Sequence, residues 1–220
     1  AVAGGLTAAL DPALLKDEGA AMDAAQTALG RVARHVFSAL GRALAPTPDM
    51  RGLATIEEVA RPAMIEIADY ITRINLPDGK PAERDRYAAL LHQADHLARL
   101  LKRLERRSVV PVLLADPGLS RMSNVLGATL RRAADPAAGG LEATRLARLS
   151  QRIEAKTKRH RRATLLHEHV GLISVAEMFD RTDAMRWLRR VSEHAARIAF
   201  YARPLPGDTA QAPADPGPAA

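Results

Sequence analysis

The sequence contains no cysteine, so disulfide bonds and thiolate metal sites are excluded. Aromatic residues make up only 3% of the chain, so the core must be built from aliphatic side chains and alanine. Runs of β-branched residues with the two-residue alternation typical of strands are absent. No signal peptide and no apolar run of about eighteen residues occurs, so the sequence predicts no membrane-spanning helix.

What the sequence does contain favours helices. The 220 residues are enough for one large domain or two small ones, and 47% of them are hydrophobic. Alanine, leucine, arginine and glutamate dominate, and all four are strong helix formers. The composition therefore predicts an all-α protein.

The chain is basic, with a net charge of +7 and a pI near 10.3. Such a charge is typical of proteins that bind nucleic acid or anionic lipid. The cations are spread over several helices, which favours an ordinary solvated positive surface. The chain has no helix-turn-helix pattern and few aromatic side chains to stack on bases, so we do not expect nucleic acid as a partner.

Apolar residues recur at steps of three and four along most of the chain, which predicts amphipathic helices. The first long helix, for example, has its stripe at Met22, Ala25, Leu29, Val32, Val36, Ala39 and Ala43. A capping box, Thr55 to Glu58, predicts the start of the second. The predicted ranges are about 17–44, 55–73, 82–107, 117–133, 141–168 and 174–202.

Two stretches of the chain nearly repeat each other. Residues 93–101 read QADHLARLL and residues 191–199 read VSEHAARIA, which places Asp95 on Glu193 and His96 on His194. The apolar stripes of the two helices coincide at the same offset of 98 residues. This predicts two tandem three-helix bundles, 17–108 and 109–203, related by an internal repeat. Residues 1–16 form an N-terminal segment, and the Pro- and Ala-rich tail 204–220 is predicted to be disordered.

The apolar stripes assign the repeated polar residues to the outer faces of their helices. His96 and His194 are therefore predicted to point away from the core. The acid-first spacing of four residues predicts surface ion pairs between Asp95 and Arg99 and between Glu193 and Arg197. On this interpretation the doubled pattern marks a duplicated scaffold.

The repeated stretches resemble the third helices of PhoU-type proteins, in which two three-helix bundles are fused in one chain. In that family each such helix carries two acids, four residues apart, that bind metal ions. Here Leu91 and Arg189 stand where the first acid of each pair would be. We therefore expect no metal and no cofactor. If a metal did bind, the resemblance would assign it to Asp95, His96, Glu193 and His194.

A second resemblance covers both ends of the ordered chain. The segment LDPALL (10–15) and the segment DAMRWLRRV (183–191), followed by Glu193-His194 and Arg197-Ile198, are similar to the cytoplasmic region of bacterial sodium/phosphate cotransporters. In that family a membrane transport domain precedes a PhoU-like helical domain. The resemblance implies a PhoU-like regulatory domain in the cytoplasm, at the inner face of the plasma membrane. Its partner would be the transport domain of the same polypeptide or a phosphate-signalling protein, and it could form a homodimer.

One segment of the fifth predicted helix is densely basic. Lys156, Lys158, Arg159, Arg161 and Arg162 fall within seven residues. They are candidates for contact with phosphate or an anionic membrane surface, although a solvated face would look the same.

The same helix turns polar along its apolar stripe. Thr157, His160, Thr164 and His167 continue the stripe, which could form a pH-sensitive contact or an anion pocket. Histidines in such positions are more often half-buried and satisfied by neighbours. In the last helix, Trp187 is expected to pack at the edge of the stripe against another helix.

No catalytic motif is recognisable, so we expect a protein that is not an enzyme. The leading hypothesis is a regulatory or interaction domain of a sodium-dependent phosphate transporter that works by protein–protein contact. The alternative is a free-standing PhoU-type regulator of phosphate signalling. A metal-dependent protein and a nucleic-acid binder are the remaining hypotheses.

Overall fold

The computed structural model of the chain describes residues 2–76, 80–138 and 140–203. The predicted disordered tail, 204–220, lies outside these residues. No strand occurs among the described residues, which confirms the all-α prediction. The α helices are α1 (Val2–Thr7), α2 (Glu18–Ala43), α3 (Arg51–Ala54), α4 (Ile56–Thr72), α5 (Pro81–Leu104), α6 (Val110–Ala115), α7 (Pro117–Ala134), α8 (Ala143–His169) and α9 (Val175–Tyr201). Short 3-10 helices cover Pro12–Lys16, Arg107–Val109 and Pro136–Ala138.

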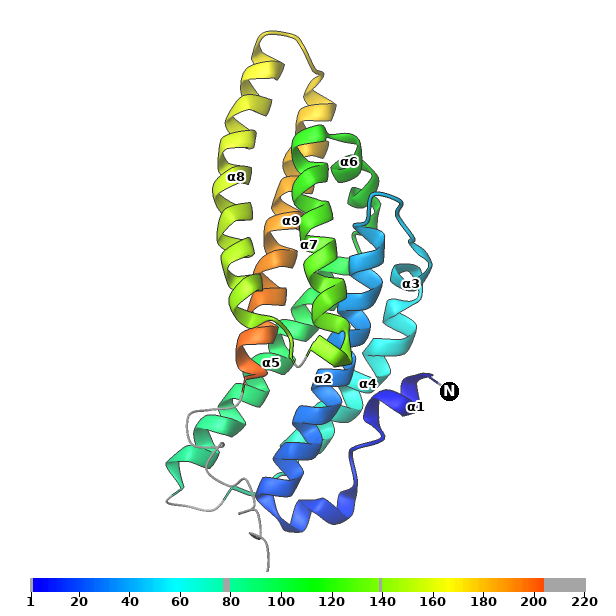
Figure 1. Ribbon diagram of the computed structural model, residues 1–220, viewed down its shortest axis with the longest axis vertical. Helices are drawn as coiled ribbons and strands as arrows, with labels where there is room; N and C mark the ends of the chain where they lie inside the picture. The colour runs from blue at the N-terminus through cyan, green and yellow to red at the C-terminus, as the bar shows by residue number, and fades with distance from the viewer. Residues whose placement is uncertain (1, 77–79, 139, 204–220) are drawn as a thin grey trace, which may run out of the picture.

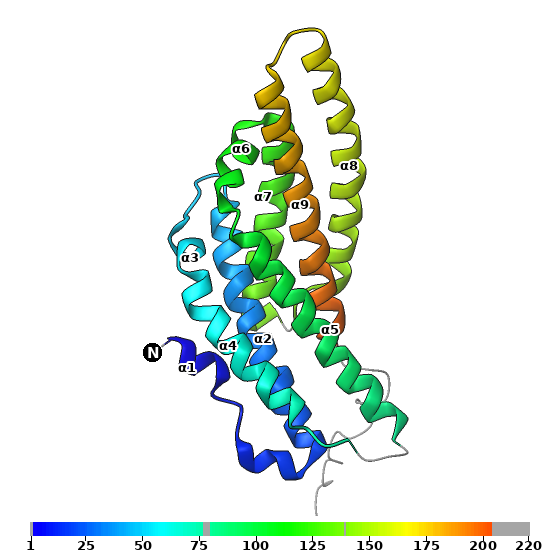
Figure 2. The ribbon, with the colours of Figure 1, turned by 180° about the vertical axis from the view of Figure 1, so that it is seen from behind.

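The long helices α2, α4, α5, α7, α8 and α9 match the predicted ranges to within three residues. Helices α2, α4 and α5 contact one another, and so do α7, α8 and α9. In addition, α2 lies along α7 and α5 lies along α9, as Figures 1 and 2 show from opposite sides. The long helices therefore form one elongated bundle, and the repeated segments of α5 and α9 lie next to each other within it.

Helix α2 lies in the middle of this bundle. Every residue of its predicted stripe is buried, and Phe37, the largest of the fully buried side chains, lies on the same helix. The stripe is wide because α2 has neighbours on several sides, namely α4, α5 and α7.

Two glycines allow α2 and α7 to approach closely. A Cβ atom added at Gly41 would lie 2.8 Å from the carbonyl oxygen of Gly127, and one added at Gly127 would lie 3.0 Å from the carbonyl oxygen of Gly41. Arg131 adds a hydrogen bond across this crossing, from Nη1 to the carbonyl of Gly41 at 2.6 Å. Contact at this point is therefore made by backbone, and neither glycine has space for a side chain.

The predicted capping box at Thr55 is wrong. Thr55 makes no capping bond, and its hydroxyl donates to the carbonyl of Arg51 instead. The short helix α3 runs directly into Thr55 and holds it at φ −101° and ψ 2°, away from the extended conformation that a cap needs. A complete capping box occurs at the start of α9, between Ser174 and Glu177.

Candidate functional site

Helices α8 and α9 form a hairpin that extends past the ends of α6 and α7 (Figures 1 and 2). No residue from 165 to 180 is buried. Leu172 is 70% exposed and Phe179 is 62% exposed. The exposed large apolar side chains of this hairpin tip are Leu165, Leu166, Val170, Leu172, Val175 and Phe179. Apolar side chains gathered on one projecting element are typical of a contact surface.

The local sequence explains why the chain turns here. Gly171 has a φ of +73°, which a residue with a side chain rarely adopts, and it ends α8. Ser174 and Glu177 then start α9 by capping each other. The backbone N–H and hydroxyl of Ser174 donate to the Glu177 carboxylate and lower its pKa. The tip is therefore a defined turn between two capped helices.

The five cations predicted as a contact site lie just behind the tip. Lys156, Lys158, Arg159, Arg161 and Arg162 are all exposed. Lys158 pairs with Glu154 at 3.0 Å, and its ammonium lowers the pKa of that carboxyl group. In the part of the chain that the structure describes, no carboxylate lies within 4.0 Å of the other four. These four charges are available to an external anion.

A small hollow of about 170 Å³ lies between α8 and α9 behind the tip. Its cations are Lys158, Arg161, Arg186 and Arg189, and Thr157, Thr182 and Met185 complete its lining. The hydroxyl of Thr182 is buried and has no partner among the described residues. Lys158 and Arg186 already pair with Glu154 and Asp183, at 3.0 and 2.8 Å. Arg161, Arg189 and the Thr182 hydroxyl remain, and they suit a single phosphate group, because arginine forks and hydroxyls both donate to its oxygens.

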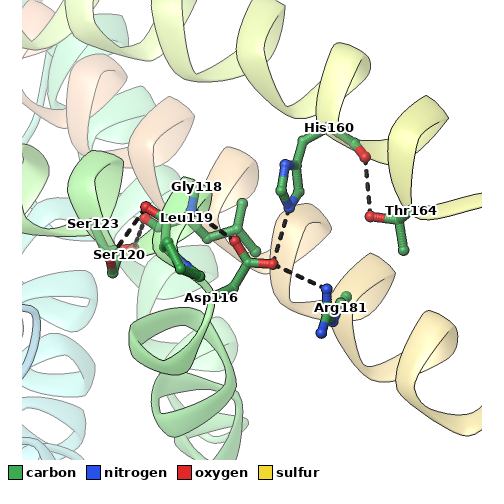
Figure 3. Close-up of polar contacts among 9 residues, drawn as sticks. Asp116, Gly118, Leu119, Ser120, Ser123, His160, Thr164 and Arg181 are labelled. Carbon is green, nitrogen blue, oxygen red and sulfur yellow. Dashed lines mark hydrogen bonds and ion pairs between the residues drawn. The ribbon is translucent and has the colours of Figure 1, made fainter. Parts of the chain in front are cut away.

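A buried carboxylate holds the half of the hairpin nearer the tip against the start of α7 (Figure 3). Asp116 caps α7 by accepting hydrogen bonds from the amides of Gly118 and Leu119 at 2.8 and 3.1 Å. The same carboxylate contacts His160 Nε2 of α8 at 3.1 Å and Arg181 Nη1 of α9 at 3.5 Å. Burial acts to raise the pKa of Asp116, but the bonds from His160 and the two amides outweigh it and leave the pKa below its usual value. Asp116 thus ties the corner before α7 to both arms of the hairpin.

Gly118 leaves the space that His160 occupies. A Cβ atom at this position would lie 2.9 Å from Cε1 of the His160 ring. The Asp116-Pro117 pair is typical of a helix start, but nothing in the sequence indicates that Asp116 also lies between α8 and α9. Arg181 was missed as well, because nothing in the sequence shows which helix lies opposite it.

The polar stripe of α8 is confirmed in part. His160 is half-buried and satisfied by Asp116, as predicted. Thr157 and Thr164 are buried, and each donates its hydroxyl to a carbonyl of its own helix. The prediction is wrong for His167, which is exposed, because it lies in the segment from 165 to 180 in which no residue is buried.

The prediction that His96 and His194 point away from the core is also wrong. His194 is only 7% exposed, and its Nδ1 lies 3.2 Å from Nδ1 of His96. The stripes were assigned within each bundle, whereas α5 and α9 also pack on each other and enclose these outer positions. Tyr201 covers the pair by stacking on His96 at 5.9 Å between ring centroids. Burial, followed by the neighbouring His96, lowers the pKa of His194 to about 4.

The acids of the repeated stretches do not join these histidines. Asp95 accepts two hydrogen bonds from Arg99 Nε, at 2.8 and 3.0 Å, so the first predicted ion pair is confirmed. The second is wrong, because Glu193 pairs with Arg190 at 3.0 Å and not with Arg197. Of the four residues assigned to a metal by resemblance, the structure brings only the two histidines together. Within residues 2–76, 80–138 and 140–203, no group of three or more His, Cys, Asp or Glu side chains could hold a metal ion jointly.

Trp187 packs as predicted. It is 4% exposed, and its Nε1 donates to the carbonyl of Arg103 on α5 at 2.8 Å. Trp187 is the only tryptophan in the sequence, so its fluorescence monitors the contact between α9 and α5.

Comparison with known proteins gives no relative. No protein-family model matches the chain, and no curated protein or solved structure matches it significantly. No helix in the described part of the chain is both long enough and apolar enough to cross a bilayer. Function must therefore be argued from the sequence and the geometry of the chain.

Proposed function

We propose that this chain is a non-catalytic regulatory domain of a sodium-dependent phosphate transporter, held against the inner face of the plasma membrane by its α8–α9 hairpin. Its contact with the transport domain would change with phosphate supply. The resemblance of segments 10–15 and 183–191 to the cotransporter family motivates the transporter assignment. The contact of α2 with α7 and of α5 with α9 is what two tandem PhoU-like bundles facing each other would produce, and it supports that arrangement.

One observation carries the membrane contact: the hairpin combines an exposed apolar tip with a basic segment behind it. Such a tip can insert leucine and phenylalanine side chains among lipid headgroups while the cations meet lipid phosphates. Between residues 156 and 181 the hairpin has six lysines and arginines against three acids, which favours an anionic surface. The basic hollow offers a place for one headgroup phosphate.

Binding to vesicles tests the membrane contact. The chain should co-sediment with vesicles of phosphatidylglycerol and phosphatidylcholine, and not with phosphatidylcholine alone. Each cation near an anionic surface contributes about 1 kcal/mol, so the double variant Arg159→Ser/Arg162→Ser should bind about 30-fold more weakly. The variant Leu172→Ser/Phe179→Ser should also lose binding, since it removes the inserted side chains.

The double variant Arg148→Ser/Arg152→Ser is the matched control. It lies on the same helix and removes the same charge, but both residues are in the half of α8 away from the tip. It should keep its affinity for the vesicles. Equal loss in the two arginine variants, or equal binding to neutral vesicles, would contradict docking through the hairpin.

The transporter assignment has its own test. The full gene product should carry transmembrane helices before residue 1 of this sequence. If the natural chain starts near residue 1, beside genes for phosphate transport, the free-standing regulator becomes the better interpretation and the transporter domain is rejected.

A further inference from the structure

A second basic feature lies on the opposite half of α8 from the hairpin tip. It is a cleft of about 1440 Å³, bordered by the middle of α2, the second half of α7, the first turns of α8 and the end of α9. We call it the arginine cleft, because α2, α7 and α8 line it with Arg31, Arg34, Arg132, Arg145, Arg148 and Arg152, and Arg203 joins them just after α9. Its volume is several times that of the hollow in the hairpin, so a ligand larger than a single phosphate would fit.

The charges in this cleft are not balanced. Glu142 is the only carboxylate among the described residues that line it. This carboxylate accepts a hydrogen bond from Arg132 at 3.1 Å and lies 3.9 Å from Arg145. Two of the seven guanidinium groups are therefore partly neutralised.

The remaining arginines have no acid beside them. Arg31 donates to the backbone carbonyl of Gly5 at 3.2 Å, and the half-buried Arg34 has a buried Nε with no partner among the described residues. Over the same residues, no carboxylate lies within 4.0 Å of Arg148 or Arg152. An unpaired buried donor and several convergent guanidinium groups are costly unless an anion meets them.

The start of α8 adds to this positive potential. Residues 142–145 line the cleft, and no side chain caps the first turn of this 27-residue helix. Its cap residue, Glu142, has a φ of +53° and turns its carboxylate to the arginines rather than to the amides of its own helix. The positive end of the helix dipole and its free N–H groups therefore face the same space as the guanidinium groups.

We infer that the arginine cleft binds a small anion carrying two or more linked phosphate groups. Guanidinium forks donate in pairs to phosphate oxygens, and the spread of arginines over three helices favours several phosphates in a row. No Phe, Tyr or Trp lines the cleft, so it offers no ring on which a nucleotide base could stack. The cleft should therefore recognise the phosphate chain and not an attached base. This inference does not depend on the proposed function of the hairpin.

Calorimetric titration of the purified chain with tripolyphosphate tests the inference. The chain should bind it saturably, and ATP should bind within a few-fold of the same affinity because both present three linked phosphates. Inorganic phosphate should bind at least about tenfold more weakly, since it can meet only part of the arginine set. The variant Arg148→Ser/Arg152→Ser should lose at least about tenfold in affinity for tripolyphosphate, and Arg34→Gln should weaken it as well.

The variant Arg159→Ser/Arg162→Ser is now the control, because it removes the same charge from α8 outside the cleft. It should bind tripolyphosphate as the parent chain does. If both double variants lost the same affinity for tripolyphosphate, binding would depend only on the net charge of the chain, and the inference would be overturned. Equal affinity for inorganic phosphate, or a much tighter complex with ATP, would each overturn the selectivity claimed here. Vesicle binding by the same two variants tests the hairpin, whereas tripolyphosphate binding tests the cleft. Each proposal can therefore fail without the other.

Discussion

At the scale of single residues, the His96–His194 pair makes stability depend on pH. The unfolded His194 titrates near 6.5, whereas burial lowers its pKa to about 4 in the folded chain. Between these values the unfolded state binds more protons, so the free energy of unfolding should fall as the pH is lowered from about 6.5 towards about 4. The loss from this residue should reach up to about 3 kcal/mol.

The substitution His194→Gln isolates this contribution. Glutamine can still bond to His96 but does not titrate, so the variant should lose less stability between pH 7 and pH 4.5 than the parent chain. His167→Gln is the matched control, since His167 is exposed, and it should leave the pH dependence unchanged. Urea unfolding at a series of pH values gives both results, and parallel curves for parent and His194→Gln would refute the assignment.

A second prediction concerns Gly118 and His160. A Cβ at Gly118 would lie 2.9 Å from Cε1 of the His160 ring, so Gly118→Ala should displace that ring and break its bond to Asp116. We expect a loss of about 1–2 kcal/mol in the free energy of unfolding. In a His160→Ala background the same change should cost less than half as much, because the ring is already gone. Additive costs in this double-mutant cycle would show that the two residues do not interact.

At the scale of elements, the ranges of the helices were more predictable from the sequence than the neighbours that each helix face contacts. Ranges follow from local signals, namely apolar spacing, prolines and glycines, and all six long helices were found. The facing of α5 and α9 depends on contacts between residues 98 positions apart, which periodicity within one helix does not contain. His194 was therefore placed outside the core, and Gln93, which is fully buried, was not identified as a core residue.

The candidate site was predictable only in its charges. The run of cations at 156–162 is visible in the sequence, and so is the break between the predicted helices 141–168 and 174–202, where Gly171 lies. The arginine cleft has no such signature, because its arginines come from three helices and the end of the described chain, between residues 31 and 203. The link from Asp116 to His160 and Arg181 is hidden for the same reason.

The hairpin tip should be the least protected part of the long helices. From 165 to 180 no side chain is buried, so its helical hydrogen bonds are held by little packing. By contrast, α9 is densely buried from Ala184 to Ala199. Amide hydrogen exchange should be at least about a hundredfold faster in the tip than in that buried segment. Equal protection in the two segments of the isolated chain would mean that the tip is covered by a second copy.

At the scale of the whole molecule, the crossing of α2 and α7 at Gly41 should control stability throughout the bundle. A Cβ at Gly41 would lie 2.7 Å from Arg131 Cγ and 2.8 Å from the backbone of Gly127, which cannot move without separating the helices. We expect Gly41→Ala to lower the free energy of unfolding by about 2–3 kcal/mol. Gly30→Ala, on the same helix, meets only the end of the Arg34 side chain at 3.7 Å and should instead stabilise the chain by about 0.5–1 kcal/mol.

The fluorescence of Trp187 extends this measurement to the far side of the bundle. Trp187 joins α9 to α5, whereas Gly41 joins α2 to α7. Because α2 also packs on α5, the long helices should unfold together, so Gly41→Ala should shift the urea midpoints of tryptophan fluorescence and circular dichroism equally. If circular dichroism shifted while the fluorescence midpoint stayed at the parent value, the α5–α9 contact would be independent of the crossing. The bundle would then consist of separately folding parts, and the stabilities argued above would apply to each part alone.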